Sequence, residues 1–212
     1  MASPLLAQRS TFVQNLCTLY RSASPAAKVT GLDWYQHART IMHEWADTYS
    51  LPLSAVCCVT AALSPQISWE RNLIIADDVL AGRPPSIGAL RKNVEKAENL
   101  YRESGNVAIL GPHYAMLSIF PTGRKVQSFA CNLFGPSEAI TVDTHGFQAA
   151  FNDPALDKTF HPSAYDIVAG CYRAAAWELD RSLEPCQIQA VIWCAWKERY
   201  PVLSKRQLRR KW

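Results

Sequence analysis

A lysine and an aspartate in the segment GRKVQSFACNLFGPSEAITVDTH, residues 123–145, have types and positions that suit covalent chemistry. We expect Lys125 in the first turn of one helix and Asp143 at the start of the next, so that both could point into one cleft of a compact helical protein. The helix dipole and partial burial would lower the pKa of Lys125 and make its amine a usable nucleophile. The same residues could equally be a solvated lysine and a helix-capping aspartate.

The composition is that of a folded globular protein, with 212 residues, 49% hydrophobic and 19% charged. The net charge of +4 permits a polyanionic partner without requiring one. The seven cysteines lie mostly in apolar helical runs without a C-x-x-C pair, so we expect reduced core thiols and no metal site. No signal peptide or apolar run of the ~18–20 residues that a membrane span needs is evident, so we expect a cytoplasmic protein with no membrane partner.

The hydrophobic periodicity is helical along almost the whole chain, which predicts an all-α fold. Breaks in the pattern are expected at SASPAAKVTG, Pro65 and GRPP, with helices starting near Asp33, Trp69, Ser86 and Pro162. Only VAILG and AITV resemble strands, and both are too short to build a sheet. Without β-α alternation or a glycine-rich phosphate loop, a dinucleotide-binding fold is excluded. We expect one compact domain over 1–212, with possible lobes of about 55–140 and of 1–54 plus 141–212.

The segment that carries Lys125 and Asp143 is similar to the helix-hairpin-helix DNA glycosylases, especially the endonuclease III group. That family has G-R-K, a helix with an asparagine and F-G, and then V-D-T-H. The residues that match in the same order are Gly123, Arg124, Lys125, Asn132, Phe134, Gly135, Val142, Asp143, Thr144 and His145. Three further segments resemble family helices and extend the likeness over roughly residues 50–200: VTAALSPQISWERNLIIA, KNVEKAENLYR and AVIWCAWKERY.

The resemblance implies a helix-hairpin-helix glycosylase fold with a cleft between two helical lobes. It also implies a partner, double-stranded DNA in which a modified or damaged base is flipped out of the stack. Lys125 would attack C1′ of the sugar as the base leaves, and the resulting Schiff base would allow strand cleavage. Asp143 would activate the lysine and stabilise positive charge that develops on the sugar.

The resemblance also assigns binding roles outside the catalytic pair. Gln66 would fill the gap that the flipped base leaves, or it is simply a polar residue at a helix end. The turn before Lys125 would present Thr122, Gly123 and Arg124 to a phosphate. The pocket could include Trp69, which could stack on a base or belong to the core, as well as Asn72 and His145, of which His145 is better explained as structural.

The chain departs from the family pattern in two places. The turn reads IFPTGRK, which is shorter than the family's and contains Pro121, and a proline lacks the N–H that would bind a phosphate. A monovalent cation at this turn is therefore less expected. The family's four-cysteine motif is absent, so we expect no iron–sulfur cluster and no other cofactor. The basic end, which carries Lys205, Arg206, Arg209, Arg210 and Lys211, could replace some DNA contacts or be a solvated tail.

Three functions fit these observations. The first is a DNA glycosylase with lysine-dependent lyase activity at abasic sites. The second is a glycosylase-fold enzyme that transfers a group onto a DNA base, as in phage base hypermodification; such a phage protein would act in the host cytoplasm. The third is a non-catalytic DNA-binding module. Protein partners cannot be deduced from the residues.

Overall fold

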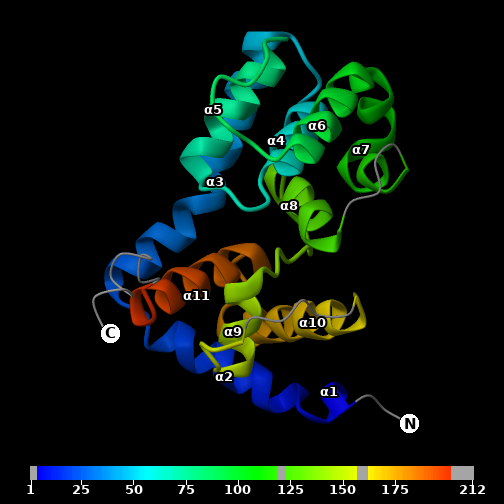
Figure 1. The fold of residues 1–212 in the computed structure, drawn as a ribbon. Coiled ribbons are helices and arrows are strands. Elements are labelled where there is room, and N and C mark those ends of the chain that lie inside the picture. Colours follow the sequence, from blue (N-terminus) through cyan, green and yellow to red (C-terminus); the bar gives the residue numbers. More distant parts are fainter. Residues whose placement is uncertain (1–3, 119–122, 157–161, 202–212) are drawn as a thin grey trace, which may run out of the picture. The chain divides into compact units, whose positions relative to one another are not determined.

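The computed structural model describes residues 4–118, 123–156 and 162–201, which form helices and no strand. This confirms the all-α prediction. The helices, labelled in Figure 1, are α1 (Pro4–Ala7), α2 (Arg9–Arg21), α3 (Pro25–Tyr49), α4 (Leu53–Leu63), α5 (Trp69–Leu80), α6 (Arg91–Arg102), α7 (Ser104–Ser118), α8 (Arg124–Phe134), α9 (Thr144–Phe151), α10 (Pro162–Leu179) and α11 (Pro185–Arg199).

The chain divides into two compact units. Unit 1 comprises residues 1–34 and 142–212, and unit 2 comprises residues 35–141. The long helix α3 contributes its first ten residues to unit 1 and the rest to unit 2. The first boundary between the units therefore lies within a helix, whereas the expected lobes placed it near residue 54.

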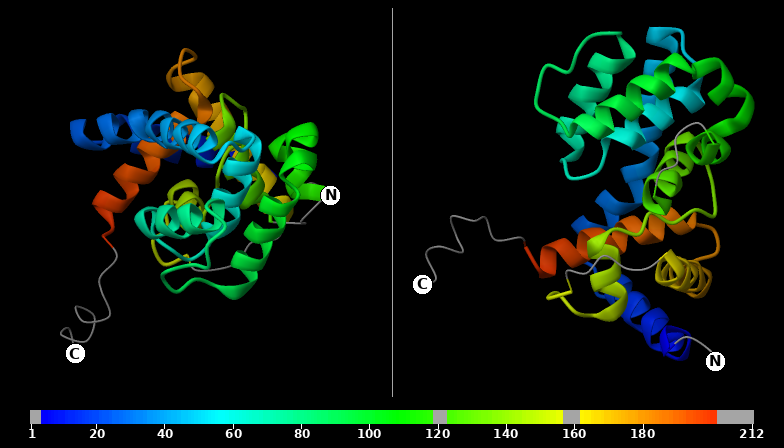
Figure 2. Two further views of the ribbon diagram at one scale, coloured as in Figure 1. Left: turned by 90° about the horizontal axis from the view of Figure 1, so that it is seen from above. Right: turned by 45° about the vertical axis from the view of Figure 1, so that its right-hand side comes forward.

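Unit 2 is built around α4, which packs against α5, α6, α7 and α8 (Figure 1), and the two further views in Figure 2 agree. The sequence of α4, LSAVCCVTAAL, is apolar on every side, and every residue from Ser54 to Leu63 is buried. A helix without a polar face can be stable in water only when other elements surround it. The position of α4 at the centre of unit 2 follows from this composition.

Unit 1 is a group of helices in which α2, α9, α10 and α11 pack against one another. Its largest fully buried side chains include Leu16, Tyr172 and Trp196. The Nδ2 group of Asn15 in α2 donates to the carbonyl of Ala150 at 2.9 Å, which fixes the end of α9. Unit 1 therefore has a core of its own, and α9 is anchored within it.

Two expected helix starts were wrong. Helix α3 begins at Pro25 rather than near Asp33, because proline suits a first helical turn and the Ser24 hydroxyl accepts from the Ala27 amide at 3.0 Å. Helix α6 begins at Arg91 rather than near Ser86, because the Asp78 carboxylate accepts from the Ser86 amide at 2.7 Å and holds that residue in the preceding loop.

The two strand-like segments also have other structures. VAILG lies in α7, which is kinked at Gly111, where φ is 71°, and continues through Pro112. AITV is a non-helical connection between α8 and α9 without strand partners among the described residues.

No single helix in the described ranges is both long and apolar enough to cross a membrane; only the sharply bent pair α3 and α4, counted together, has the necessary length and hydropathy.

Candidate functional site

The Asp143 carboxylate is held by two N–H donors within unit 1. As the N-cap of α9, it accepts through Oδ1 from the Gly146 amide at 2.8 Å. Its other oxygen, Oδ2, accepts from the indole Nε1 of Trp193 in α11 at 3.1 Å. The capping interpretation of Asp143 is thus observed, and it is compatible with a chemical role because the side chain is only half-buried. Two directed hydrogen bonds fix the orientation of this carboxylate.

Trp193 is itself held by neighbouring side chains. The Lys197 ammonium lies over its ring at 4.0 Å from the centroid, which is cation–π geometry. The His145 ring approaches edge-on, with centroids 6.3 Å apart. A cation, an aromatic ring and a carboxylate therefore converge on one indole next to the N-terminus of α9.

His145 belongs to a second set of contacts that joins α9 to α11. Its Nδ1 lies 3.0 Å from Oε1 of Gln148, and the same oxygen accepts from Nε1 of Trp196 at 3.2 Å. The Gln148 amide also donates to the carbonyls of Pro154 and Leu156. These contacts link His145 in α9 to Trp196 in α11 through Gln148.

Tyr172 in α10 contacts the first turn of α9. Its hydroxyl donates to the Gly146 carbonyl at 3.1 Å. Burial raises the pKa of Tyr172 well above its ordinary value, and the negative charge of Asp143 raises it further. Tyr172 is therefore a neutral hydrogen-bond donor at physiological pH.

Lys125 occupies the second position of α8 in unit 2, as expected from the sequence. It is half-buried, and it forms no ion pair or hydrogen bond with the residues that the structure describes. The opposite face of α8 is buried through Val126, Phe129, Ala130 and Leu133. The amphipathic helix therefore leaves Lys125 on its solvent-accessible side, just after the exposed residues Gly123 and Arg124.

The motif asparagine, Asn132, organises the connection after α8. Its amide donates to the Thr141 hydroxyl at 3.1 Å, and its Oδ1 accepts from the Ser137 hydroxyl at 2.7 Å. The Arg39 guanidinium donates to the carbonyls of Asn132 and Gly135. These bonds fix the chain that leads from α8 towards Asp143, and the contribution of Arg39 carried no local sequence signal.

Gln66 is exposed in the short loop between α4 and α5, with a φ of 67°. A non-glycine residue in this left-handed region costs of order 1–3 kcal/mol and persists only when the surroundings hold it. The Asn93 amide donates to the Pro65 carbonyl at 3.4 Å, and Ser68 caps α5 by accepting from the Arg71 amide. The loop is thus supported on both sides of an exposed, conformationally strained glutamine.

Trp69 and Asn72 lie in the packing contacts of α5. The Trp69 ring meets the Phe129 ring edge-on at 6.1 Å. Asn72 is buried and donates to the Thr60 carbonyl at 3.1 Å, while its Oδ1 and the Thr60 hydroxyl are buried without partners among the described residues. Trp69 is half-buried, so the structure leaves part of its surface accessible.

The candidate residues are therefore distributed over both units. Unit 1 contains Asp143 and His145, and unit 2 contains Gln66, Trp69, Asn72, Gly123, Arg124 and Lys125. Thr122, Pro121 and the basic end of the chain lie outside the described residues. Within the described ranges, no group of three or more His, Cys, Asp or Glu side chains could hold a metal ion.

Trp193 and Lys197 were not identified as site residues from the sequence. They lie in the segment AVIWCAWKERY, which resembles a family helix, but the pattern of that helix gives no indication of a bond to Asp143.

No curated protein and no solved structure matches the chain. The model of a family of unknown function, DUF7178, matches residues 3–200, and the chain therefore belongs to that family.

Proposed function

We propose that the protein is a DNA glycosylase of the helix-hairpin-helix type that removes a flipped, modified or damaged base and cleaves the strand through a lysine Schiff base. The observation that supports this most directly is the Asp143 carboxylate, held by the Gly146 amide and the Trp193 indole. An ionised aspartate only accepts hydrogen bonds, and both of these donors suit that form. A fixed carboxylate of this kind is suited to stabilise positive charge on a sugar.

The helical pair around Lys125 supports the same function. Helices α7 and α8 are consecutive in the chain and pack against each other within unit 2. Lys125 lies in the first turn of α8 and has no carboxylate partner among the described residues. Its amine would therefore be available for a substrate.

The reaction begins when the Lys125 ammonium gives up a proton to solvent, which leaves an amine that can act as a nucleophile. Its nitrogen forms a bond to C1′ of the sugar, and the bond from C1′ to the base breaks with its electron pair moving to the base. The base takes up a proton and the new ammonium loses one. The nitrogen lone pair then forms a C1′=N bond as the C1′–O4′ bond breaks, and O4′ takes up a proton, which gives the protonated Schiff base. Loss of a proton from C2′ then expels the 3′ phosphate and breaks the strand. Asp143 stabilises the positive charge on the sugar during the first step.

Borohydride trapping tests this proposal. The protein is incubated with duplexes that carry uracil, oxidised, alkylated or hypermodified bases, and base release, strand cleavage and the trapped adduct are each measured. We expect an adduct on one class of duplex that is lost in Lys125→Ala and retained in Lys28→Ala, a control lysine in unit 1. Full activity in both Lys125→Ala and Asp143→Asn would overturn the assignment.

The same experiment separates the other two functions. A base whose mass changes while both strands stay intact would identify a group-transfer enzyme. Binding with neither base release nor a change in base mass on any duplex would identify a non-catalytic DNA-binding module.

A further inference from the structure

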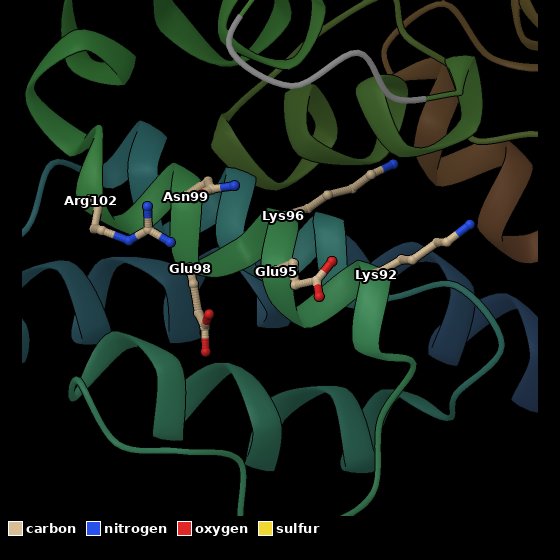
Figure 3. Close-up of a pocket in the computed structure, with 6 residues that line it drawn as sticks. All are labelled: Lys92, Glu95, Lys96, Glu98, Asn99 and Arg102. Carbon is tan, nitrogen blue, oxygen red and sulfur yellow. The ribbon is translucent and has the colours of Figure 1, made fainter.

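The exposed side of α6 carries a surface hollow of about 440 Å³, lined entirely by side chains of that helix: Lys92, Glu95, Lys96, Glu98, Asn99 and Arg102. Figure 3 shows the ammonium groups of Lys92 and Lys96 extending to the same side of α6, with the Glu98 carboxylate on the opposite side. The two lysines are one helical turn apart, which places their Cα atoms about 6 Å apart along the axis. They form a short stripe of positive charge.

The positive charge of this stripe is not neutralised locally. Glu95 accepts from Arg91 at 2.8 Å. Lys92 and Lys96 form no ion pair with any residue in the described part of the chain. Unit 2 as a whole has nine Lys and Arg residues against nine Asp and Glu residues, so the stripe is a local feature of a neutral unit. A pair of unpartnered cations at helical spacing fits a polyanion with a regular charge repeat.

The stripe begins beside the loop that presents Gln66. Asn93, the residue after Lys92, donates to the Pro65 carbonyl, and Pro65 directly precedes Gln66. The first turn of α6 therefore supports the exposed glutamine, and Lys92 in that turn and Lys96 in the next carry the free ammonium groups. One strand of DNA carries a phosphate every ~3.4 Å of its axis, so two lysines one turn apart can reach separate phosphates of one strand.

We propose that Lys92 and Lys96 bind backbone phosphates of the DNA strand next to the position at which Gln66 meets the bases. This inference rests on the proposed function, because it takes DNA as the partner. It adds a surface on α6 that would bind the backbone of one DNA strand, and this surface is separate from the candidate catalytic residues. Its contribution is electrostatic and independent of base identity.

The salt dependence of binding tests the stripe. The probes are a duplex that carries a tetrahydrofuran abasic-site analogue and the same duplex undamaged, titrated by fluorescence anisotropy between about 50 and 200 mM salt, the range over which phosphate contacts dominate affinity. Each lost phosphate contact should reduce the slope of log K against log salt by about 0.9. For Lys92→Gln/Lys96→Gln we therefore expect a slope smaller by about 1.8 on both duplexes.

Two controls make the result specific. Lys28→Gln/Arg181→Gln removes the same net charge from unit 1, and we expect it to leave the slope unchanged. Glu98→Gln changes the charge on the opposite side of α6, and we expect it to leave the slope unchanged as well. Thermal denaturation of every variant shows that the fold is retained, as expected for substitutions at solvent-accessible side chains.

The outcomes separate this inference from the proposed function. If the wild-type protein binds both duplexes and Lys92→Gln/Lys96→Gln does not change the slope, the proposed role of the stripe in phosphate binding is overturned. The proposed function is not affected by that result. An equal loss of slope in Lys28→Gln/Arg181→Gln would show an effect of net charge alone, and it would also overturn the proposed role of the stripe. A wild-type protein that binds neither duplex at low salt overturns both.

Discussion

The indole of Trp193 determines which way the Asp143 carboxylate faces. The backbone amide of Gly146 holds one carboxylate oxygen, as in any capped helix, but the second oxygen depends on a side chain. Lys197 on the ring face and His145 at the ring edge restrict the rotation of that indole. In the proposed reaction, Trp193 is therefore a positioning residue that acts through Asp143.

We predict that Trp193→Phe lowers kcat for base release and leaves KM nearly unchanged. Phenylalanine keeps an aromatic ring for Lys197 and His145 but lacks the N–H that donates to Asp143. A hydrogen bond to a charged group contributes about 1.5–3 kcal/mol, so kcat should fall by roughly 10- to 100-fold. Single-turnover kinetics measure this directly. The matched control is Trp196→Phe, which removes an indole N–H that donates to Gln148 instead; equal losses of kcat in both variants would contradict the prediction.

At the residue scale, the sequence predicted where Lys125 and Asp143 lie but not what holds them. Lys125 in a first helical turn and Asp143 as a cap follow from local patterns of glycine, aspartate and apolar spacing. The bond between Trp193 and Asp143 joins residues that are fifty positions apart. It depends on how α11 packs against α9, and no local pattern encodes that contact. The same holds for Arg39, whose guanidinium donates to two carbonyls at the C-terminal end of α8.

At the scale of elements, the loop between α5 and α6 is held by one buried carboxylate. Asp78 is buried and accepts from the Ser86 amide and from the Arg83 guanidinium. Hydrogen bonds from the hydroxyl and amide of Ser86, together with those from Arg83, hold the pKa of Asp78 below its ordinary value. Arg83 also pairs with Asp77 at 2.8 Å.

This network predicts a specific acid sensitivity. Because the pKa of Asp78 is lower in the folded protein than the ordinary value of about 3.9, its contribution to stability is present above that value. The contribution is lost as the pH falls through the folded pKa. Urea unfolding at a series of pH values should therefore show that the free energy of unfolding falls more steeply towards acid pH in wild type than in Asp78→Asn. The exposed variant Glu95→Gln is the control, and identical pH profiles of wild type and Asp78→Asn would contradict the argument.

A second prediction at this scale concerns the close approach of α3 and α11 at Gly31 in unit 1. A methyl group added at Gly31 in α3 would lie 2.5 Å from the backbone nitrogen of Val191 in α11. Backbone cannot move aside as a flexible side chain can, so Gly31→Ala should destabilise the protein by about 1–3 kcal/mol. Gly105→Ala in α7 is the matched control, because a methyl there meets no atom within 4 Å. Chemical denaturation measures both, and equal stabilities would refute the close approach.

Gly31 also shows why some helix boundaries could not be predicted. Within SASPAAKVTG it looked like a helix breaker, but it lies inside α3, where the backbone of Val191 in α11 leaves no room for a side chain. By contrast, α4, α5, α10 and α11 start or end where proline, glycine or serine signals act locally. The start of α3 has a local signal in Ser24 and Pro25, which the apparent break at Gly31 outweighed, whereas the start of α6 depends on Asp78 in α5 and has no local signal.

At the scale of the whole molecule, the two residues of the proposed chemistry belong to different units. Lys125 is in unit 2 and Asp143 is in unit 1. Each is positioned by contacts within its own unit: the buried face of α8 for Lys125, and Gly146 with Trp193 for Asp143. The proposed function nevertheless requires both residues to act on one chemical step, and kinetics can examine that requirement independently of geometry.

We predict that Lys125→Ala and Asp143→Asn are strongly non-additive in base release. Each substitution should reduce the single-turnover rate by roughly 100- to 10,000-fold, the range for loss of a nucleophile or a charge-stabilising group. If both act on attack at C1′, the loss in the double variant should be close to that of the more damaging single variant, because the second residue has nothing left to assist. Losses that multiply would instead place the two residues on separate steps, and a single variant with unchanged rate would remove that residue from the chemistry. Parallel measurements of unfolding free energy would distinguish a lost cap at Asp143 from a lost catalytic charge, since only the former lowers stability along with the rate.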